Sequence, residues 1–275
     1  MNSLPSPLPS ALAGCRALVA EDDPVLQLLL TETLAEVGID PVLATDGHQA
    51  VALARAQPFD WVLMDVFMPG MDGLEATRRL RATDATARLC IIGLSGNDDA
   101  PSRAACRAAG MSDFLAKPID TEALLERLHG WLGRPHEAAT AAAPQATEAG
   151  TDGAAAAAID LSRLDALCSG DAERTRKYAG HFLAAVEAGH TAMAQALAAG
   201  ELDRLQGEAH RLKSSARWVG ALGLGDLFAA VEAAARSGDR DRLPPLLADC
   251  RRAGADFSDR LQRHLAQTAA TGAQA

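Results

Sequence analysis

The 275-residue sequence has no apolar run long enough to cross a bilayer, because polar residues interrupt its longest apolar segments. Its five cysteines are an odd number without paired spacing, which argues against a disulfide framework and against a cysteine-based metal site. Residues 1–14 contain no lysine or arginine and are interrupted by three prolines, so we interpret them as a disordered tail and not as a secretory signal. We therefore expect a soluble, cytoplasmic protein that does not insert into a membrane.

The sequence also lacks an excess of basic residues, and its net charge is −10. Residues 1–134 hold 11 Lys or Arg and 18 Asp or Glu, residues 135–158 hold none and 3, and residues 159–275 hold 15 of each. Binding to a phosphate backbone needs a basic domain, so we do not expect nucleic acid as a direct partner. The chain instead joins an acidic half to a neutral half.

Residues 135–158 separate two halves with different patterns. This segment contains Ala, Thr, Pro and Gly but no large apolar residue, so it cannot build a core and we interpret it as a linker. Before it, short apolar runs alternate with helical periodicity, which predicts a parallel sheet with helices on both faces. The five expected strands are Ala17–Ala20, Pro41–Ala44, Trp61–Met64, Cys90–Leu94 and Phe114–Ala116.

After the linker the pattern is helical throughout, and glycines separate several of the expected helices. This pattern predicts an antiparallel helical bundle over residues 159–265, followed by a disordered tail at 266–275. The expected helices are 160–168, 171–187, 189–199, 201–219, 222–236 and 240–265.

Polar residues stand at the carboxyl ends of the expected strands, where an open parallel sheet has its functional crevice. Clustered carboxylates repel each other unless a cation neutralises them, and oxygen ligands without imidazole or thiolate favour Mg²⁺. The residues that follow the strands are Glu21, Asp22, Asp23, Asp65, Ser95 and Lys117.

These residue types suit the transfer of a phosphoryl group. With Mg²⁺ bound, Asp65 stays ionised and can attack phosphorus, while Ser95 and Lys117 contact the transferred oxygens. The alternative is that each acid only caps a following helix, as we expect for Asp23 before Pro24.

Four stretches of the first half carry a family resemblance. They read LVAEDDPV, VLMDVFMPGMDGLEATRRLR, IIGLSGND and DFLAKPID. On these stretches, residues 15–134 resemble a response-regulator receiver domain, which implies a doubly wound, flavodoxin-like α/β fold with five parallel strands. The resemblance implies phosphorylation of Asp65. It also implies Mg²⁺ held by Asp22, Asp65 and the main-chain carbonyl of Phe67, with Glu21 assisting.

The resemblance further implies that Ser95 and Lys117 bind the phosphoryl group and that Phe114 occupies the aromatic switch position. Ser95 stands where many receivers have threonine, which keeps the hydroxyl group. Phe114 replaces the commoner tyrosine, which removes a hydrogen-bonding group. The alternative for Phe114 is a core position, because aromatic residues in short strands are commonly buried.

A second candidate site lies in the stretch EAHRLKSSARWVGA, residues 208–221. If this stretch is helical, its spacing places His210 on one face with Lys213 and Arg217 and with the small residues Gly207 and Ser214. The neighbours of the histidine are cations and not further ligands, so we do not expect a metal site. The alternative is a solvated basic face of an amphipathic helix.

The stretches IDLSRLDAL and AHRLKSSARWVGA, with the helices between them, resemble a histidine-containing phosphotransfer (HPt) domain over residues 159–265. The resemblance implies that His210 is phosphorylated and that Lys213, with Arg217, offsets the added negative charge. Gly207 and Ser214 leave room for the active site of another protein. Ser214 stands where the family usually has glycine.

We therefore expect a phosphorelay protein that accepts a phosphoryl group on Asp65 and carries one on His210. We recognise no ATP-binding kinase segment and no DNA-binding module in the sequence, so we expect a sensor histidine kinase, another response regulator, or both as partners. Two other functions stay open. One is a phosphate sink that drains a kinase, and the other is an adaptor whose binding does not depend on phosphorylation.

Overall fold

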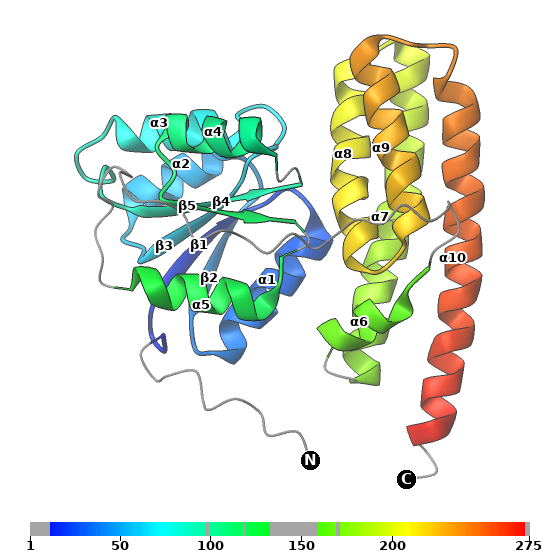
Figure 1. Ribbon diagram of the computed structural model, residues 1–275, viewed down its shortest axis with the longest axis horizontal. Helices are drawn as coiled ribbons and strands as arrows, with labels where there is room; N and C mark the ends of the chain where they lie inside the picture. The colour runs from blue at the N-terminus through cyan, green and yellow to red at the C-terminus, as the bar shows by residue number, and fades with distance from the viewer. Residues whose placement is uncertain (1–11, 97–98, 118, 133–158, 169–170, 273–275) are drawn as a thin grey trace. The chain divides into compact units, whose positions relative to one another are not determined.

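The computed structural model describes residues 12–272 except 97–98, 118, 133–158 and 169–170. These residues form two units, one built on a β-sheet and one built from helices (Figure 1). The linker expected at 135–158 lies outside the described residues, as does most of the expected N-terminal tail. In the part of the chain that the structure describes, no helix has both the length and the hydropathy needed to cross a bilayer.

Five parallel strands form one sheet in the order β2-β1-β3-β4-β5. All five expected strands are confirmed, and each is one residue longer than expected. The strand order reverses at β1, which pairs with β2 on one side and β3 on the other, so the crevice lies at the carboxyl ends of β1 and β3. The strands are β1 Arg16–Ala20, β2 Asp40–Ala44, β3 Trp61–Asp65, β4 Cys90–Ser95 and β5 Asp113–Ala116.

Helices cover both faces of this sheet. In Figure 1, α1 and α5 lie on one face, and α2, α3 and α4 lie on the other. This arrangement confirms the doubly wound α/β fold. The helices are α1 Pro24–Glu36, α2 Gly47–Ala56, α3 Gly73–Arg81, α4 Ala100–Ala109 and α5 Thr121–Trp131.

An aspartate caps the start of each of these five helices. At α1, the carboxylate of Asp23 accepts a hydrogen bond from the main-chain N–H of Val25 at 2.8 Å, so its expected capping role is confirmed. Glu21 and Asp65 both form ion pairs with Lys117, so helix capping does not explain the whole set of acids at the strand ends. The other caps are Asp46, Asp72, Asp99 and Asp120.

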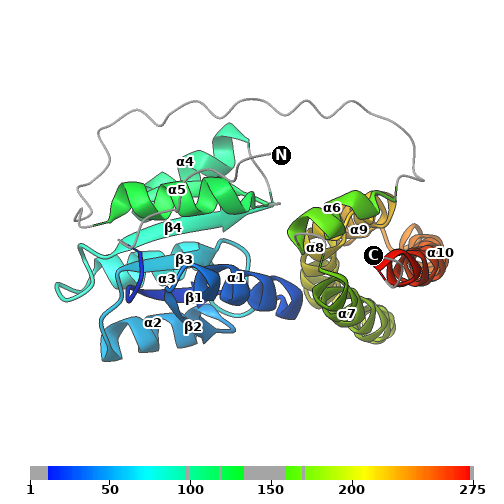
Figure 2. The same cartoon turned by 90° about the horizontal axis from the view of Figure 1, so that it is seen from below.

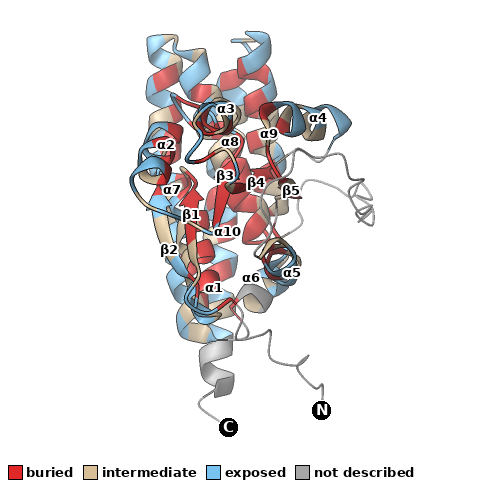
Figure 3. Ribbon diagram, turned by 90° about the vertical axis from the view of Figure 1, so that its left-hand side faces the viewer, coloured by how far each residue is buried: buried red, intermediate tan, exposed pale blue. Residues whose placement is uncertain are grey.

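The core of the first unit includes all of strands β3 and β4. Every residue of β3 and β4 is buried, because helices cover both faces of the sheet (Figure 3). At the end of β3, α3 approaches so closely that a Cβ atom on Gly73 would lie 2.0 Å from the carbonyl oxygen of Asp65. A glycine at the start of α3 therefore lets this helix pack beside the aspartate.

The second unit is an antiparallel helical bundle. Helix α8 packs against α7 and α9, and α10 also packs against α7 and α9, so four helices close a ring that Figure 2 shows close to end-on. Short connections join consecutive helices, which makes them antiparallel neighbours. The fifth, shorter helix, α6, packs against α7. The helices are α6 Leu161–Leu167, α7 Ala172–Ala199, α8 Leu202–Trp218, α9 Leu222–Ser237 and α10 Leu243–Gly272.

Three sequence predictions differ from the structure. The helices expected at 171–187 and 189–199 are one continuous helix, α7, because Gly189 lies inside it and packs against Leu212 of α8. Helix α10 continues to Gly272, into the tail expected at 266–275. Leu12, in the expected N-terminal tail, is buried because an apolar side chain gains from leaving water.

Candidate functional site

Three carboxylates meet at the carboxyl ends of β1 and β3. Glu21 and Asp22 follow β1, and Asp65 ends β3. One oxygen of each residue lies within 4.8 Å of the other two. The two strands are parallel neighbours in the sheet, which is why residues more than 40 positions apart in sequence come together here. A set of oxygen donors of this kind suits a hard divalent cation.

Lys117, which follows β5, neutralises two of these carboxylates. Its Nζ atom lies 2.7 Å from Oε2 of Glu21 and 2.7 Å from Oδ2 of Asp65. All three side chains are almost fully buried. Burial alone would lower the pKa of Lys117, but the charges of Asp65 and Glu21 outweigh it and raise the pKa. The lysine therefore stays cationic beside the aspartate.

The loop after β3 binds the other oxygen of Asp65. The main-chain N–H of Phe67 donates to Oδ1 of Asp65 at 3.1 Å, while the phenyl ring is 43% exposed. The serine hydroxyl group that the sequence predicts for this site lies on the strand next to β3. Ser95 is buried at the end of β4, directly after Leu94, the residue that pairs with Asp65. Asp65 is thus held on both sides by groups from neighbouring segments.

Phe114 lies in β5 and is neither fully buried nor fully exposed. The guanidinium carbon of Arg103, on α4, lies 5.7 Å from the centre of its ring, a distance that permits a cation–π contact. Phe114 pairs with Gly93 of β4, two residues before Ser95. The ring is therefore on the strand beside the serine, at the edge between α4 and the sheet.

His210 lies in the middle of α8, as the sequence predicts, and it has a partner on α9. Its Nδ1 atom lies 3.1 Å from Oε1 of Glu232. Nζ of Lys213 donates to Oε2 of the same glutamate at 2.8 Å and lies 3.4 Å from Nδ1 of His210. One carboxylate thus connects the histidine and the lysine that the sequence places on one helical face.

The electrostatics of Glu232 decide which nitrogen of His210 carries the proton. Burial alone would raise the pKa of Glu232, but the hydrogen bonds from His210 and Lys213 outweigh it and lower the pKa to about 2. The carboxylate is therefore ionised at neutral pH and can only accept hydrogen bonds. It follows that the neutral imidazole carries its proton on Nδ1, and that Nε2 holds the lone pair.

Sequence reasoning missed Glu232. It lies 22 residues after His210 and on a different helix, so no local spacing links the two. A signal was present in the segment Val231–Ala235, because Glu232 is a single buried acid among apolar residues there. A buried carboxylate normally has a cationic or hydrogen-bonding partner, which should direct attention to such a residue.

The remaining residues of the predicted face have separate roles. Ser214 donates to the carbonyl oxygen of His210 at 3.4 Å. The guanidinium group of Arg217 lies 3.2 Å from a carboxylate oxygen of Asp226 on α9. Of the two expected cations, Lys213 is therefore the one that the structure brings to the histidine.

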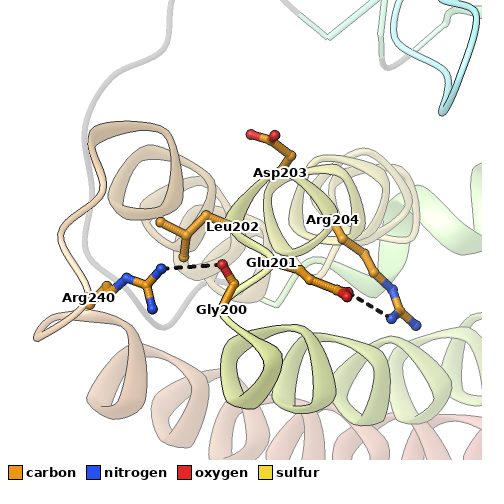
Figure 4. A pocket seen from close by; sticks show the side chains of 6 residues that line it. All are labelled: Gly200, Glu201, Leu202, Asp203, Arg204 and Arg240. Carbon is orange, nitrogen blue, oxygen red and sulfur yellow. Dashed lines mark hydrogen bonds and ion pairs between the residues drawn. The ribbon is translucent and has the colours of Figure 1, made fainter.

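A shallow hollow lies at the turn between α7 and α8, and neither His210 nor Glu232 lines it (Figure 4). Arg240 donates to the carbonyl oxygen of Gly200 at 3.3 Å, and Arg204 pairs with Glu201 at 3.1 Å. Both guanidinium groups are thus engaged by neighbouring residues. We assign no chemistry to this hollow.

Comparison with known protein families divides the chain in the same way. The family described as response regulator receiver domain matches residues 17–129, and the Hpt domain family matches residues 177–271. The first match includes the carboxylate cluster, and the second includes His210 and Glu232.

Several known proteins are similar to this chain. The virulence sensor protein BvgS of Bordetella pertussis is 32% identical over 222 residues, which are 79% of this chain and 18% of BvgS. The sensor histidine kinase GacS of Pseudomonas protegens is 30% identical over 74% of this chain and 22% of GacS. The chain thus spans about a fifth of the length of these two relatives.

Smaller relatives match the first unit alone. Protein PilH of Pseudomonas aeruginosa is 35% identical over 117 residues, which are 42% of this chain and 97% of PilH. The receiver domain of the sensor histidine kinase PA1611 from Pseudomonas aeruginosa, solved with a magnesium ion in its active site cleft, is 40% identical. It covers 44% of this chain and 99% of its own, with a TM-score of 0.42. On the family matches and the similarity to PilH, this chain belongs to the response regulator receiver family and also contains an Hpt domain.

Proposed function

We propose that the chain is a phosphorelay protein that accepts a phosphoryl group on Asp65 and carries one on His210. One observation carries the proposal: the same chain holds a buried aspartate paired with a lysine and a histidine oriented by a glutamate. The first arrangement suits attack on phosphorus by oxygen, and the second suits attack by nitrogen. Such a protein can move a phosphoryl group between an aspartate and a histidine.

We infer that the carboxylate cluster binds Mg²⁺. The cluster offers one oxygen each from Glu21, Asp22 and Asp65 within 4.8 Å of one another. Mg²⁺ prefers oxygen ligands, and the closeness of these three carboxylate oxygens would suit a single ion. The main-chain carbonyl of Phe67 is the fourth protein ligand that we propose. When bound, the ion neutralises part of the negative charge of the carboxylates and of the phosphoryl oxygens.

At the receiver, the chemistry is an attack by a carboxylate oxygen of Asp65 on the phosphorus of a phosphohistidine. The P–N bond breaks as the P–O bond forms, and the electron pair returns to the ring nitrogen of the departing imidazole, which leaves neutral because its other nitrogen keeps a proton. Lys117 contacts the phosphoryl oxygens in this state, and its raised pKa keeps it charged for that role. The hydroxyl group of Ser95 donates a hydrogen bond to the same oxygens.

At the bundle, Nε2 of His210 attacks phosphorus, because Glu232 holds the proton on Nδ1. Positive charge develops on the ring as the N–P bond forms, and the carboxylate of Glu232 stabilises it. Lys213, held by the same carboxylate, offsets the charge of the phosphoryl group. We propose Phe114 as the residue that couples phosphorylation of Asp65 to the surface beside α4.

The partners that we propose are a sensor histidine kinase and another response regulator. Both kinds of protein exchange phosphoryl groups with receiver and Hpt domains, and two of the relatives are themselves sensor proteins. We keep the cytoplasm as the expected compartment, since such kinases present their phosphohistidine there. We also propose the boundaries 15–134 and 159–265 for the two domains.

The proposal is tested by labelling the full-length chain with radioactive acetyl phosphate in Mg²⁺. We expect a base-labile label on Asp65 and, where the group moves on, an acid-labile label on His210. Asp65→Asn should abolish the base-labile label, and His210→Gln should abolish the acid-labile one. Base-labile label that persists in Asp65→Asn would contradict the proposal for the receiver.

The two alternative functions predict different effects on a partner kinase. A phosphate sink would dephosphorylate the kinase without passing label to any downstream receiver. An adaptor would bind its partner equally well with Asp65→Asn. Phosphorylation of Asp65 that changes partner binding would therefore exclude the adaptor.

A further inference from the structure

On the surface of α8, the residues on the two sides of His210 differ in size and charge. Successive residues of an α-helix turn by about 100°, so Gly207 and Ser214 lie about 60° and 40° to one side of His210, and Lys213 lies about 60° to the other. Because Lys213 and His210 both contact Glu232, α9 lies on the lysine side. The side with the two small residues therefore faces away from α9.

The imidazole ring lies closest to Gly207 of these two small residues. Side chains of an α-helix tilt toward its N-terminus, so the ring of His210 covers the preceding turn, which contains Gly207. With Nδ1 turned toward α9, the Nε2 edge of the ring is directed away from α9, on the side of the exposed Gly207 and the buried Ser214. A side chain at position 207 would stand beside the nitrogen that attacks phosphorus.

The packing of the bundle does not require a glycine at position 207. A Cβ atom on Gly189 would lie 2.5 Å from Leu212, and one on Gly225 would lie 2.9 Å from Arg217, so helix contacts require these two glycines. A Cβ atom on Gly207 would meet no atom within 4 Å, and the residue is exposed. A glycine inside a helix lowers the stability of the helix relative to alanine, so Gly207 does not stabilise α8.

An open helical glycine is not sufficient to indicate a function, because Gly180 of α7 is equally exposed and equally uncrowded. Gly207 differs from Gly180 in its position one turn before His210. The burial of the carboxylate in a receiver domain, as seen at Asp65, supplies a second reason. Asp65 is only 2% exposed, so an imidazole reaches such a carboxylate only when the loops around it contact the flanking residues.

We propose that Gly207 is a specificity-determining residue of the Hpt domain, whose missing side chain admits the strand-end loops of a phosphorylated receiver to Nε2 of His210. The inference rests on the proposed function of His210. In the step that it permits, the P–O bond of the aspartyl phosphate breaks and the N–P bond forms. The electron pair returns to the carboxylate, and the proton stays on Nδ1 beside Glu232. The acidic edge of a receiver also complements the cation Lys213 in charge.

The experiment uses full-length chains as donor and acceptor. The donor is His210→Gln, labelled on Asp65 with radioactive acetyl phosphate and Mg²⁺. The acceptor is Asp65→Asn, immobilised by a tag, with Gly207 intact or replaced by Ala or Leu. A matched acceptor carries Gly180→Leu. Each acceptor is also labelled by phosphoramidate, a donor too small to contact position 207.

We expect Gly207→Leu to lower the ratio of the protein-donor rate to the phosphoramidate rate at least about 10-fold. Gly207→Ala should lower this ratio less while raising the urea midpoint of the bundle. Gly180→Leu should leave the ratio unchanged.

An unchanged ratio in Gly207→Leu would overturn the inference and leave the proposed function intact. So would an equal decrease in Gly180→Leu. If phosphoramidate labels the acceptor with Gly207 intact but the protein donor does not, the assignment of this surface to such a receiver would be overturned. An acceptor labelled by neither donor would overturn the proposed function of His210 together with the inference.

Discussion

Asp65 and His210 are each oriented by a residue that lies far away in the sequence. Lys117 holds one oxygen of Asp65 from 52 residues away, and Glu232 holds Nδ1 of His210 from 22 residues away. In both cases the partner is an ion that burial makes effective, because charges interact more strongly away from water. Each partner therefore orients the side chain that we propose to react.

The first prediction at this scale concerns Glu232. Glu232→Ala removes the acceptor at Nδ1, and a hydrogen bond to a charged group is worth roughly 1.5–3 kcal/mol. We expect the rate of phosphoryl transfer to His210 to fall about 10- to 100-fold, since each 1.4 kcal/mol corresponds to about a factor of ten. Glu232→Gln keeps an oxygen acceptor and should lose much less. Initial rates of acid-labile labelling measure both, and equal rates in the two variants and the parent would contradict this role.

Glu232 also makes the stability of the bundle depend on pH. The pKa of Glu232 is lowered to about 2, whereas an unfolded glutamate titrates near about 4.3. A carboxyl group with a lowered pKa contributes stability above the unfolded value, and this contribution is lost as the pH falls toward 2. Between pH 5 and pH 2.5, we therefore expect the urea midpoint of Glu232→Gln to fall less than that of the parent chain.

At the scale of elements, α8 is positioned by close contacts with its two neighbours. Gly189 of α7 and Gly225 of α9 each remove a side chain from an interhelical contact with α8. The contact at Gly225 permits the close approach of α9 to α8, the two helices that carry Glu232 and His210. The predicted break between the helices 171–187 and 189–199 is wrong, because α7 is continuous there and Gly189 packs against α8.

The prediction at this scale compares two glycines of α7. In Gly189→Ala, the new methyl group would lie 2.5 Å from Cδ1 of Leu212, which is fully buried. We expect a net loss of about 1–3 kcal/mol in the free energy of unfolding, despite the better helix propensity of alanine. Gly180→Ala is the control, since its Cβ atom meets nothing within 4 Å and should add up to about 1 kcal/mol. Urea denaturation measures both, and a stabilised Gly189→Ala would refute the packing role.

At the scale of the whole molecule, the chain consists of a receiver domain, an intervening segment and an Hpt domain. The alternation of apolar runs and helical periodicity was sufficient to predict all five strands, because in a buried parallel strand nearly every residue is apolar. It was also sufficient to predict that Glu21, Asp22 and Asp65 meet, since the carboxyl ends of neighbouring parallel strands lie at one edge. These features follow from local sequence and from one general rule of sheet topology.

The prediction at this scale concerns residues 135–158. The segment contains Glu137 and Glu148 but no lysine or arginine. We therefore expect a glutamate-specific protease to divide the folded chain there first, into two resistant fragments, because extended polar segments are cut before packed domains. Trypsin is the control, since it has no cleavage site within the segment. Mass spectrometry of the first products measures the outcome, and first cuts inside 15–134 or 159–265 would disprove the proposed boundaries.

The amino-acid sequence alone was sufficient to predict the two fold classes, the acids at the strand ends and the helical face that carries His210. These features depend on periodicity within one segment. Contacts between segments decided the rest. The positions of Glu232 beside His210 and of Gly189 against Leu212, and the different surroundings on the two sides of His210, each depend on how one helix packs against another. Such contacts follow from the shapes of side chains far apart in sequence, and the local pattern of residues carries no measure of them.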